Sequence, residues 1–143
     1  MKKLLYLSLL ILALGCQNRD KFPSNINPLL TGKWEMTAYY ATLSGNDREW
    51  KTIDSLTGQP TLIIRSDGAF LFGNGKGMCC GPGGKVTING EAMFLNPTMP
   101  ITYDEICQLI DCIICNDNVF EVDEEKLVWM RCGTIRSQYR RLP

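Results

Sequence analysis

Six cysteines in the second half of this 143-residue chain are the side chains with the clearest capacity for chemistry. They are Cys79, Cys80, Cys107, Cys112, Cys115 and Cys132. The last four have the spacing of a plant-type iron–sulfur loop, and four thiolates could equally hold a zinc ion. The chain contains no histidine, which excludes Ser-His and Cys-His catalytic pairs and zinc sites built on imidazole.

The seventh cysteine follows a segment typical of a secretory signal peptide. After a basic start, an almost unbroken apolar run extends from Leu4 to Leu14, and its eleven residues are fewer than the about 20 that cross a bilayer. The sequence Leu12-Ala13-Leu14-Gly15-Cys16 resembles a bacterial lipobox, which implies cleavage after Gly15. Cys16 would then carry a diacylglycerol and acyl chains such as palmitate. We therefore expect a lipoprotein of the cell envelope, held by lipid in the periplasmic leaflet of the outer membrane.

The other six cysteines fit a disulfide framework better than a metal site. The segment around Cys107–Cys115 is rich in isoleucine and leucine, whereas loops that hold iron–sulfur clusters are rich in small residues. Thiols of exported proteins are usually oxidised, and an even number of cysteines suits complete pairing. We predict two or three disulfides and no metal. Spacing does not select the pairing, although the adjacent Cys79 and Cys80 are expected to bond to different partners.

The elements predicted for the domain are mostly strands, and five of the six cysteines fall in the connections between them. Residues 1–15 form the predicted signal peptide and residues 16–28 a polar, flexible tether, so the domain spans residues 29–143. Asp67-Gly68 and Asn89-Gly90 join alternating apolar segments and are strong signals for tight hairpins. We predict eight strands at about 34–40, 61–65, 69–72, 85–88, 91–95, 119–122, 127–132 and 136–142. Sequential hairpins pair antiparallel, and closure removes exposed edges, so we expect an all-β, eight-stranded antiparallel barrel.

Three segments between the strands have other patterns. Thr102-Tyr103-Asp104-Glu105 fits a capping box, and apolar residues follow at helical spacing, which predicts one short helix at about 102–115. Six glycines between Gly73 and Gly84 predict a loop, and their spacing fits neither phosphate-binding nor dinucleotide-binding motifs. Asp123-Glu124-Glu125 lies between two predicted strands and is interpreted as a solvated turn.

Short motifs along residues 29–142 follow the pattern of a known family. They are Leu30-Thr31-Gly32-Lys33-Trp34, Trp50, Leu62 to Phe70, Leu127-Val128-Trp129, Cys132-Gly133 and Tyr139-Arg140-Arg141. With these motifs the chain resembles the lipocalin-like domains of bacterial lipoproteins. The resemblance implies a barrel with Trp34 packed at the closed end, under the guanidinium of Arg140 or Arg141. The META domain of heat-shock lipoproteins shares the tryptophan opening, but its Gly-Cys-Asn is replaced here by Met78-Cys79-Cys80-Gly81.

Charge and motifs favour binding over catalysis. The formal net charge is zero, so the chain offers no basic balance for nucleic acid. A Gly-x-Ser-x-Gly motif is absent from the sequence, and we expect neither an enzyme nor a cofactor. The leading hypothesis is a lipid-anchored, lipocalin-like barrel that binds a small apolar ligand.

Two alternatives remain open at this point. The barrel could be packed solid with Trp34, Phe70, Phe72, Met93, Phe94 and Trp129, and the protein would then be an interaction module of the envelope. Its partner would meet the Gly73–Gly84 loop or an outer face. The minority alternatives are a META-like domain and a thiol-redox or metal protein built on the cysteines.

Overall fold

A computed structural model describes residues 26–42, 48–54, 60–112, 115 and 117–143. The predicted signal peptide, Gly15, Cys16 and most of the predicted tether lie outside the described residues. The elements in chain order are β1 (Gly32–Thr42), β2 (Arg48–Thr52), β3 (Thr61–Ile64), β4 (Phe70–Phe72), β5 (Lys85–Ile88), β6 (Glu91–Phe94), the 3₁₀ turn η2 (Glu105–Gln108), β7 (Asn118–Val122), β8 (Lys126–Arg131) and β9 (Ile135–Leu142).

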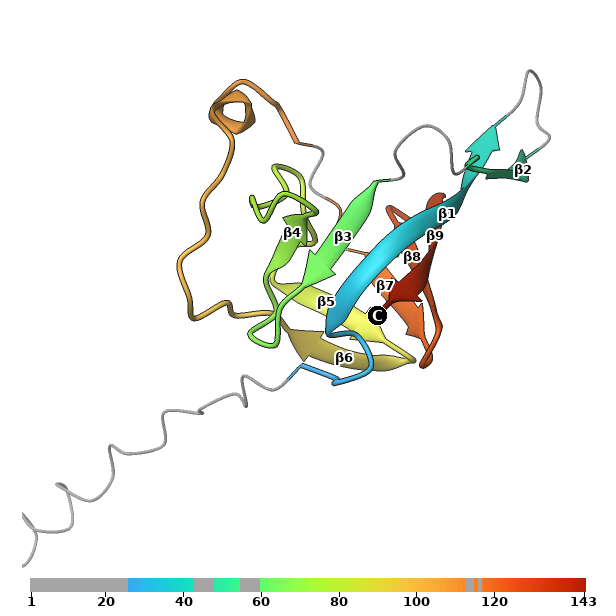
Figure 1. The fold of residues 1–143 in the computed structure, drawn as a ribbon, viewed down its shortest axis with the longest axis horizontal. Coiled ribbons are helices and arrows are strands. Elements are labelled where there is room, and N and C mark those ends of the chain that lie inside the picture. The colour runs from blue at the N-terminus through green and yellow to red at the C-terminus, as the bar shows by residue number, and fades with distance from the viewer. Residues whose placement is uncertain (1–25, 43–47, 55–59, 113–114, 116) are drawn as a thin grey trace, which may run out of the picture.

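The nine strands form one sheet that curls into a half-barrel (Figure 1). Its order is β4-β3-β1-β9-β8-β7-β5-β6, and β2 pairs with the far end of β1. The long β1 connects the parts of the sheet, since it pairs with β3, β9 and β2 in turn. Neighbouring strands are antiparallel except β5 and β7, which are parallel. The outermost strands of the described sheet, β4 and β6, do not pair with each other, so the sheet is open on that side.

The predicted hairpins at Asp67-Gly68 and Asn89-Gly90 are confirmed. The first joins β3 to β4 and the second joins β5 to β6. Gly68 has a φ of 88°, and both residues of the second turn have positive φ, 49° at Asn89 and 89° at Gly90. Such values suit the twist of a tight hairpin and are adopted most readily by glycine and asparagine.

Aromatic side chains fill the concave face of the sheet. Phe120 and Trp129 stack with ring centroids 5.3 Å apart, and the Phe70 ring lies 5.3 Å from Phe120 and 5.8 Å from Trp129. The buried indole of Trp129 donates a hydrogen bond to Asn118 Oδ1 at 3.1 Å, and this satisfies its polar atom. In sequence, the core residues of the described part of the chain begin at Ile26 and end at Tyr139. A protein of residues 17–143 therefore contains all of them.

The prediction of a closed, purely antiparallel barrel of eight strands is wrong in three respects. The sheet has nine strands, and the one that was not predicted is β2. It is mixed, because β7 follows a long connection from β6 and pairs in parallel with β5. It is also not closed, because the outermost strands of the described sheet, β4 and β6, do not pair with each other. The all-β class itself is confirmed.

The predicted helix at 102–115 is reduced to the single 3₁₀ turn η2. Asp104 stands at its N-cap position but makes no side-chain cap, since its carboxylate pairs with Lys76 Nζ at 2.9 Å. Two apolar residues of this segment do not pack against the core: Ile106 is exposed, and Leu109 is 85% exposed. Among the described residues, no helix has the length and apolar character to cross a membrane.

Candidate functional site

The connection between β6 and β7 runs along the open side of the half-barrel, past β4 (Figure 1). We call residues 95–112 of this connection the strap. Facing it is the connection between β4 and β5, residues 73–84, which we call the glycine loop. The strap and the glycine loop together carry four of the six cysteines that the sequence singled out.

Two disulfides join the strap to the glycine loop. Cys79 bonds to Cys107 and Cys80 to Cys112, with Cα–Cα distances of 5.0 and 5.4 Å. The third disulfide joins Cys115 to Cys132, beyond the end of β8. The prediction of a disulfide framework is therefore confirmed with three bonds, and the adjacent Cys79 and Cys80 do bond to different partners. The framework fixes the strap against residues far from it in the sequence.

Asp67 holds the start of the strap. Its side chain is only 7% exposed and accepts hydrogen bonds from the backbone N–H groups of Thr98 and Met99, at 3.1 and 3.0 Å. Arg65 pairs with the same carboxylate through two N–H donors, at 2.9 and 2.7 Å. The hydrogen bonds from Arg65, supported by the backbone donors and opposed by burial, lower the pKa of Asp67 from 3.8 to about 2.

Gly77 brings the middle of the strap against the glycine loop. Its N–H donates to the carbonyl of Thr102 at 2.8 Å, and it forms isolated bridges with Leu71 and Tyr103. A Cβ at this position would lie 2.5 Å from Ile101 Cγ2 and 2.6 Å from the ring of Tyr103. The strap therefore requires glycine here because of close packing.

A cavity of about 340 Å³ lies inside the half-barrel, next to the aromatic core. Its walls come from β1, β3, β8 and β9, which contribute Met36, Leu62, Trp129 and Tyr139. The glycine loop and the strap line it as well, through the first two disulfides and Ile110. The complete lining is Met36, Pro60, Thr61, Leu62, Phe72, Met78, Cys79, Cys80, Ile110, Trp129, Arg131 and Tyr139. We call it the strand cavity.

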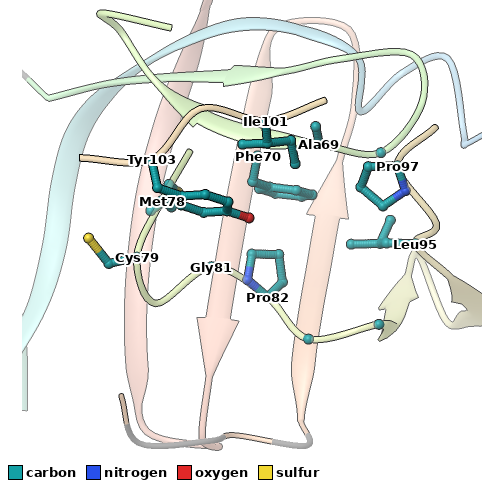
Figure 2. Close-up of a pocket in the computed structure, with 13 residues that line it drawn as sticks. Ala69, Phe70, Met78, Cys79, Gly81, Pro82, Leu95, Pro97, Ile101 and Tyr103 are labelled. Carbon is teal, nitrogen blue, oxygen red and sulfur yellow. The ribbon is translucent and has the colours of Figure 1, made fainter. Parts of the chain in front are cut away.

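A second cavity, of about 300 Å³, lies between β4, the glycine loop and the start of the strap. Figure 2 shows the rings of Phe70, Tyr103 and Pro82 around it, with Leu95 and Pro97 at one side. Four of its lining residues are glycines, so at these positions a ligand would meet backbone atoms and no side chains. The lining of the strand cavity contains no glycine and includes the large side chains of Trp129, Tyr139 and Met36, so it is the better candidate for a ligand site.

Trp34 is fully buried among the core residues, and Arg141 covers it. The Cζ atom of Arg141 lies 4.1 Å from the centroid of the Trp34 ring. Arg140, the other arginine considered, points elsewhere and forms an ion pair with Glu35 at 2.6 Å. Arg141 and not Arg140 is thus the residue that stacks on Trp34.

The remaining sequence motifs form turns. Asp123 Oδ1 accepts the N–H groups of Glu125 and Lys126 at 2.9 and 2.7 Å, and these bonds lower the pKa of Asp123. Gly75 in the glycine loop has a φ of 81°, which a tight turn requires. Phe94 is exposed, and Phe72 is exposed at the rim of the strand cavity, whereas Trp34, Phe70 and Trp129 are buried in the interior.

The sequence analysis missed two residues of this site. Asp67 was interpreted only as a hairpin residue, although an arginine two positions before a buried aspartate is a usable local signal. Arg131 was not singled out, because its place in the strand cavity depends on the pairing of β8 with β7 and β9. Comparisons with known protein families, with curated proteins and with solved structures found no match to the chain.

Proposed function

We propose that the protein is a lipid-anchored binding protein of the cell envelope that holds a small apolar molecule in the strand cavity. The observation that carries this proposal is the lining of the cavity. Methionine, leucine, phenylalanine, tryptophan and tyrosine side chains converge on about 340 Å³, a volume at the lower end of the range typical of small-molecule sites. The site is framed by strands, which position side chains more firmly than loops do.

The disulfides support binding because they fix the covering of the cavity before a ligand arrives. Cys79 and Cys80 line the strand cavity and are bonded to the strap on either side of Ile110. A covering held in place loses little conformational entropy when a ligand binds, and pre-organisation of this kind increases affinity. Catalysis is not proposed, since the lining of the strand cavity contains no acidic residue, no histidine and no hydroxyl group paired with a base.

The proposal is tested with a neutral, apolar fluorescent dye, phenylnaphthylamine, added to residues 17–143 after export into an oxidising compartment. Met36→Trp replaces a methionine in the lining of the strand cavity with a larger, rigid indole. We expect this variant to bind the dye at least about tenfold more weakly. Met130→Trp is the matched control, because Met130 lies on the other face of β8 in a different groove. Equal dye affinity in wild type, Met36→Trp and Met130→Trp would contradict the proposed site.

The membrane anchor is a separate part of the proposal and rests on the lipobox-like sequence that ends in Cys16. Cys16→Ala should abolish incorporation of labelled palmitate and release the protein from the membrane fraction. Retention of label in this variant would show that the lipid is carried elsewhere. The anchor and the cavity can fail independently, since one depends on Cys16 and the other on the sheet.

An interaction module is the second candidate, favoured by the exposed apolar end of the strap. Ile106 within η2 and Leu109 at its C-terminal end are exposed, and the disulfides of Cys107 and Cys112 hold this segment in position. Exposed apolar side chains held on a fixed support are typical of protein contacts. Ile106→Asp with Leu109→Asp should abolish binding to an envelope protein while leaving dye affinity unchanged.

A further inference from the structure

Arg131 is the one charged residue in the lining of the strand cavity. It is the last residue of β8 and is half-buried. Its Cζ atom lies 4.6 Å from the centroid of the Trp129 ring, so the guanidinium rests on an aromatic wall of the cavity. Tyr139 lines the same space from β9.

The guanidinium of Arg131 has no acidic partner within the described part of the chain. Arg65 and Arg140 form ion pairs with Asp67 and Glu35, and Arg141 donates to backbone carbonyls. Asp111 lines a neighbouring cavity together with Arg131, yet no ion pair joins the two among the described residues. A half-buried cation without a carboxylate is costly unless another anion compensates it.

The stacked position leaves the binding edge of the guanidinium available. An arginine that lies with its face on an aromatic ring still presents its N–H donors in the plane of the group. Two of these donors match the two oxygens of a carboxylate. Tyr139 adds no negative charge at neutral pH, because a tyrosine ionises only near pH 10. Burial raises the pKa of Tyr139 further, and the hydrogen bond with Ser137 and the charge of Arg131 act in the opposite direction.

We infer that the ligand of the strand cavity is an amphiphile with a short apolar tail and one carboxylate, which pairs with Arg131. The inference rests on the proposed function, because it requires that the strand cavity bind an apolar molecule. The tail would contact Met36, Leu62 and Trp129, and the carboxylate would lie at the Arg131 side of the cavity. The small volume favours a medium-length chain over a long one.

Three probes with the same tail and different head groups test the inference: decanoate, decanol and decyltrimethylammonium. Their affinities for residues 17–143 are measured by calorimetry at neutral pH and low salt. We expect decanoate to bind most tightly and the cation least tightly. Arg131→Gln should lower the affinity for decanoate by at least about tenfold, because the variant cannot form a charged hydrogen-bonded pair with the carboxylate. It should leave decanol nearly unchanged.

Two further variants make the test specific. Arg131→Lys keeps the charge and should retain most of the preference for decanoate. Arg136→Gln is the matched control, because Arg136 also stacks on an aromatic ring, Tyr40, but lines a groove on the other face of the sheet. A preference for decanoate that survives Arg131→Gln, or equal binding of decanoate and decanol to wild type, overturns the inference and leaves the proposed function standing. Failure of all three probes to bind overturns both.

Discussion

The guanidinium of Arg141 lies over the indole of Trp34, with 4.1 Å between its Cζ atom and the ring centroid. The same side chain donates to the carbonyl of Thr31 at 2.8 Å and to that of Glu124 at 2.6 Å, and it also donates to Leu29. Arg141 thereby joins β9 to the segment before β1 and to the turn between β7 and β8. One side chain near the end of the chain stabilises three separate parts of the fold.

Replacement of Arg141 should therefore destabilise the protein more than replacement of its neighbour. Arg141→Gln loses the stacking on Trp34 and several hydrogen bonds, and we expect the free energy of unfolding to fall by about 2 kcal/mol. Arg140→Gln loses one ion pair of an exposed side chain with Glu35 and should cost less than about 1 kcal/mol. Urea unfolding of both variants measures the difference. Equal midpoints would contradict the role assigned to Arg141.

Stability should fall in acid through Asp67. Its pKa is about 2 in the folded protein against 3.8 for an ordinary aspartate, so the folded state favours the ionised form. This stabilisation is present above about pH 4 and is lost as the pH falls towards 2. Asp67→Asn should lower the free energy of unfolding at neutral pH by about 2 kcal/mol, because hydrogen bonds to a charged carboxylate are lost.

The free energy of unfolding is measured by urea denaturation at several pH values between 2 and 7. Wild type should lose stability below about pH 4, and Asp67→Asn should show a smaller loss over the same range. Asp123→Asn is the comparison: the carboxylate of Asp123 also has a lowered pKa but lies in an exposed turn, so this variant should reduce the acid loss less than Asp67→Asn does. An unchanged acid dependence in Asp67→Asn would show that another group is responsible.

Gly77→Ala should displace the strap. The added methyl group would lie 2.5 Å from Ile101 and 2.6 Å from Tyr103, and overpacking of this kind costs about 1–3 kcal/mol. Gly83→Ala is the matched control in the same loop, since nothing lies within 4 Å of the position of its Cβ. Thermal unfolding and dye affinity are measured for both. Identical behaviour of the two variants would argue against close packing at Gly77.

The three disulfides predict the mass of the exported protein and which disulfide matters most for ligand binding. The exported protein should weigh about 6 Da less than its reduced form, because each of the three bonds removes two hydrogens. Replacing both Cys80 and Cys112 with serine should cost about 2–4 kcal/mol and weaken dye binding, since both residues hold the covering of the strand cavity. Replacing Cys115 and Cys132 should affect stability more than dye binding. Peptide mapping under non-reducing conditions tests the pairing itself.

The parts of the fold that follow from local chemistry could be predicted from the sequence. Asn89-Gly90 specifies a tight hairpin because both residues adopt positive φ readily. The inward positions of Phe120 and Leu127 follow from alternation along β7 and β8. β2 was missed because its sequence, Arg-Glu-Trp-Lys-Thr, lacks that alternation and forms a strand by pairing with β1.

Features set by contacts far apart in sequence could not be predicted. The helical spacing of Ile106, Leu109 and Ile110 is present, but Ile106 and Leu109 are exposed and only Ile110 of the three lines the strand cavity, so the segment is held by disulfides instead. The open side of the sheet and the parallel pairing of β5 with β7 depend on the path of the strap. The position of Arg131 in the strand cavity also follows from long-range pairing, since β8 lies between β7 and β9.

The methionine methyl groups give the most direct test of ligand binding in the strand cavity. Met36 lines the strand cavity, Met78 lines both it and the second cavity, and Met93 and Met130 line grooves elsewhere. In a methyl NMR titration of residues 17–143 with decanoate, the Met36 and Met78 signals should shift together and saturate at one concentration, while Met93 and Met130 stay in place. Shifts at Met93 or Met130 without shifts at Met36 and Met78, or no shift at any methionine, would contradict a ligand site in the strand cavity.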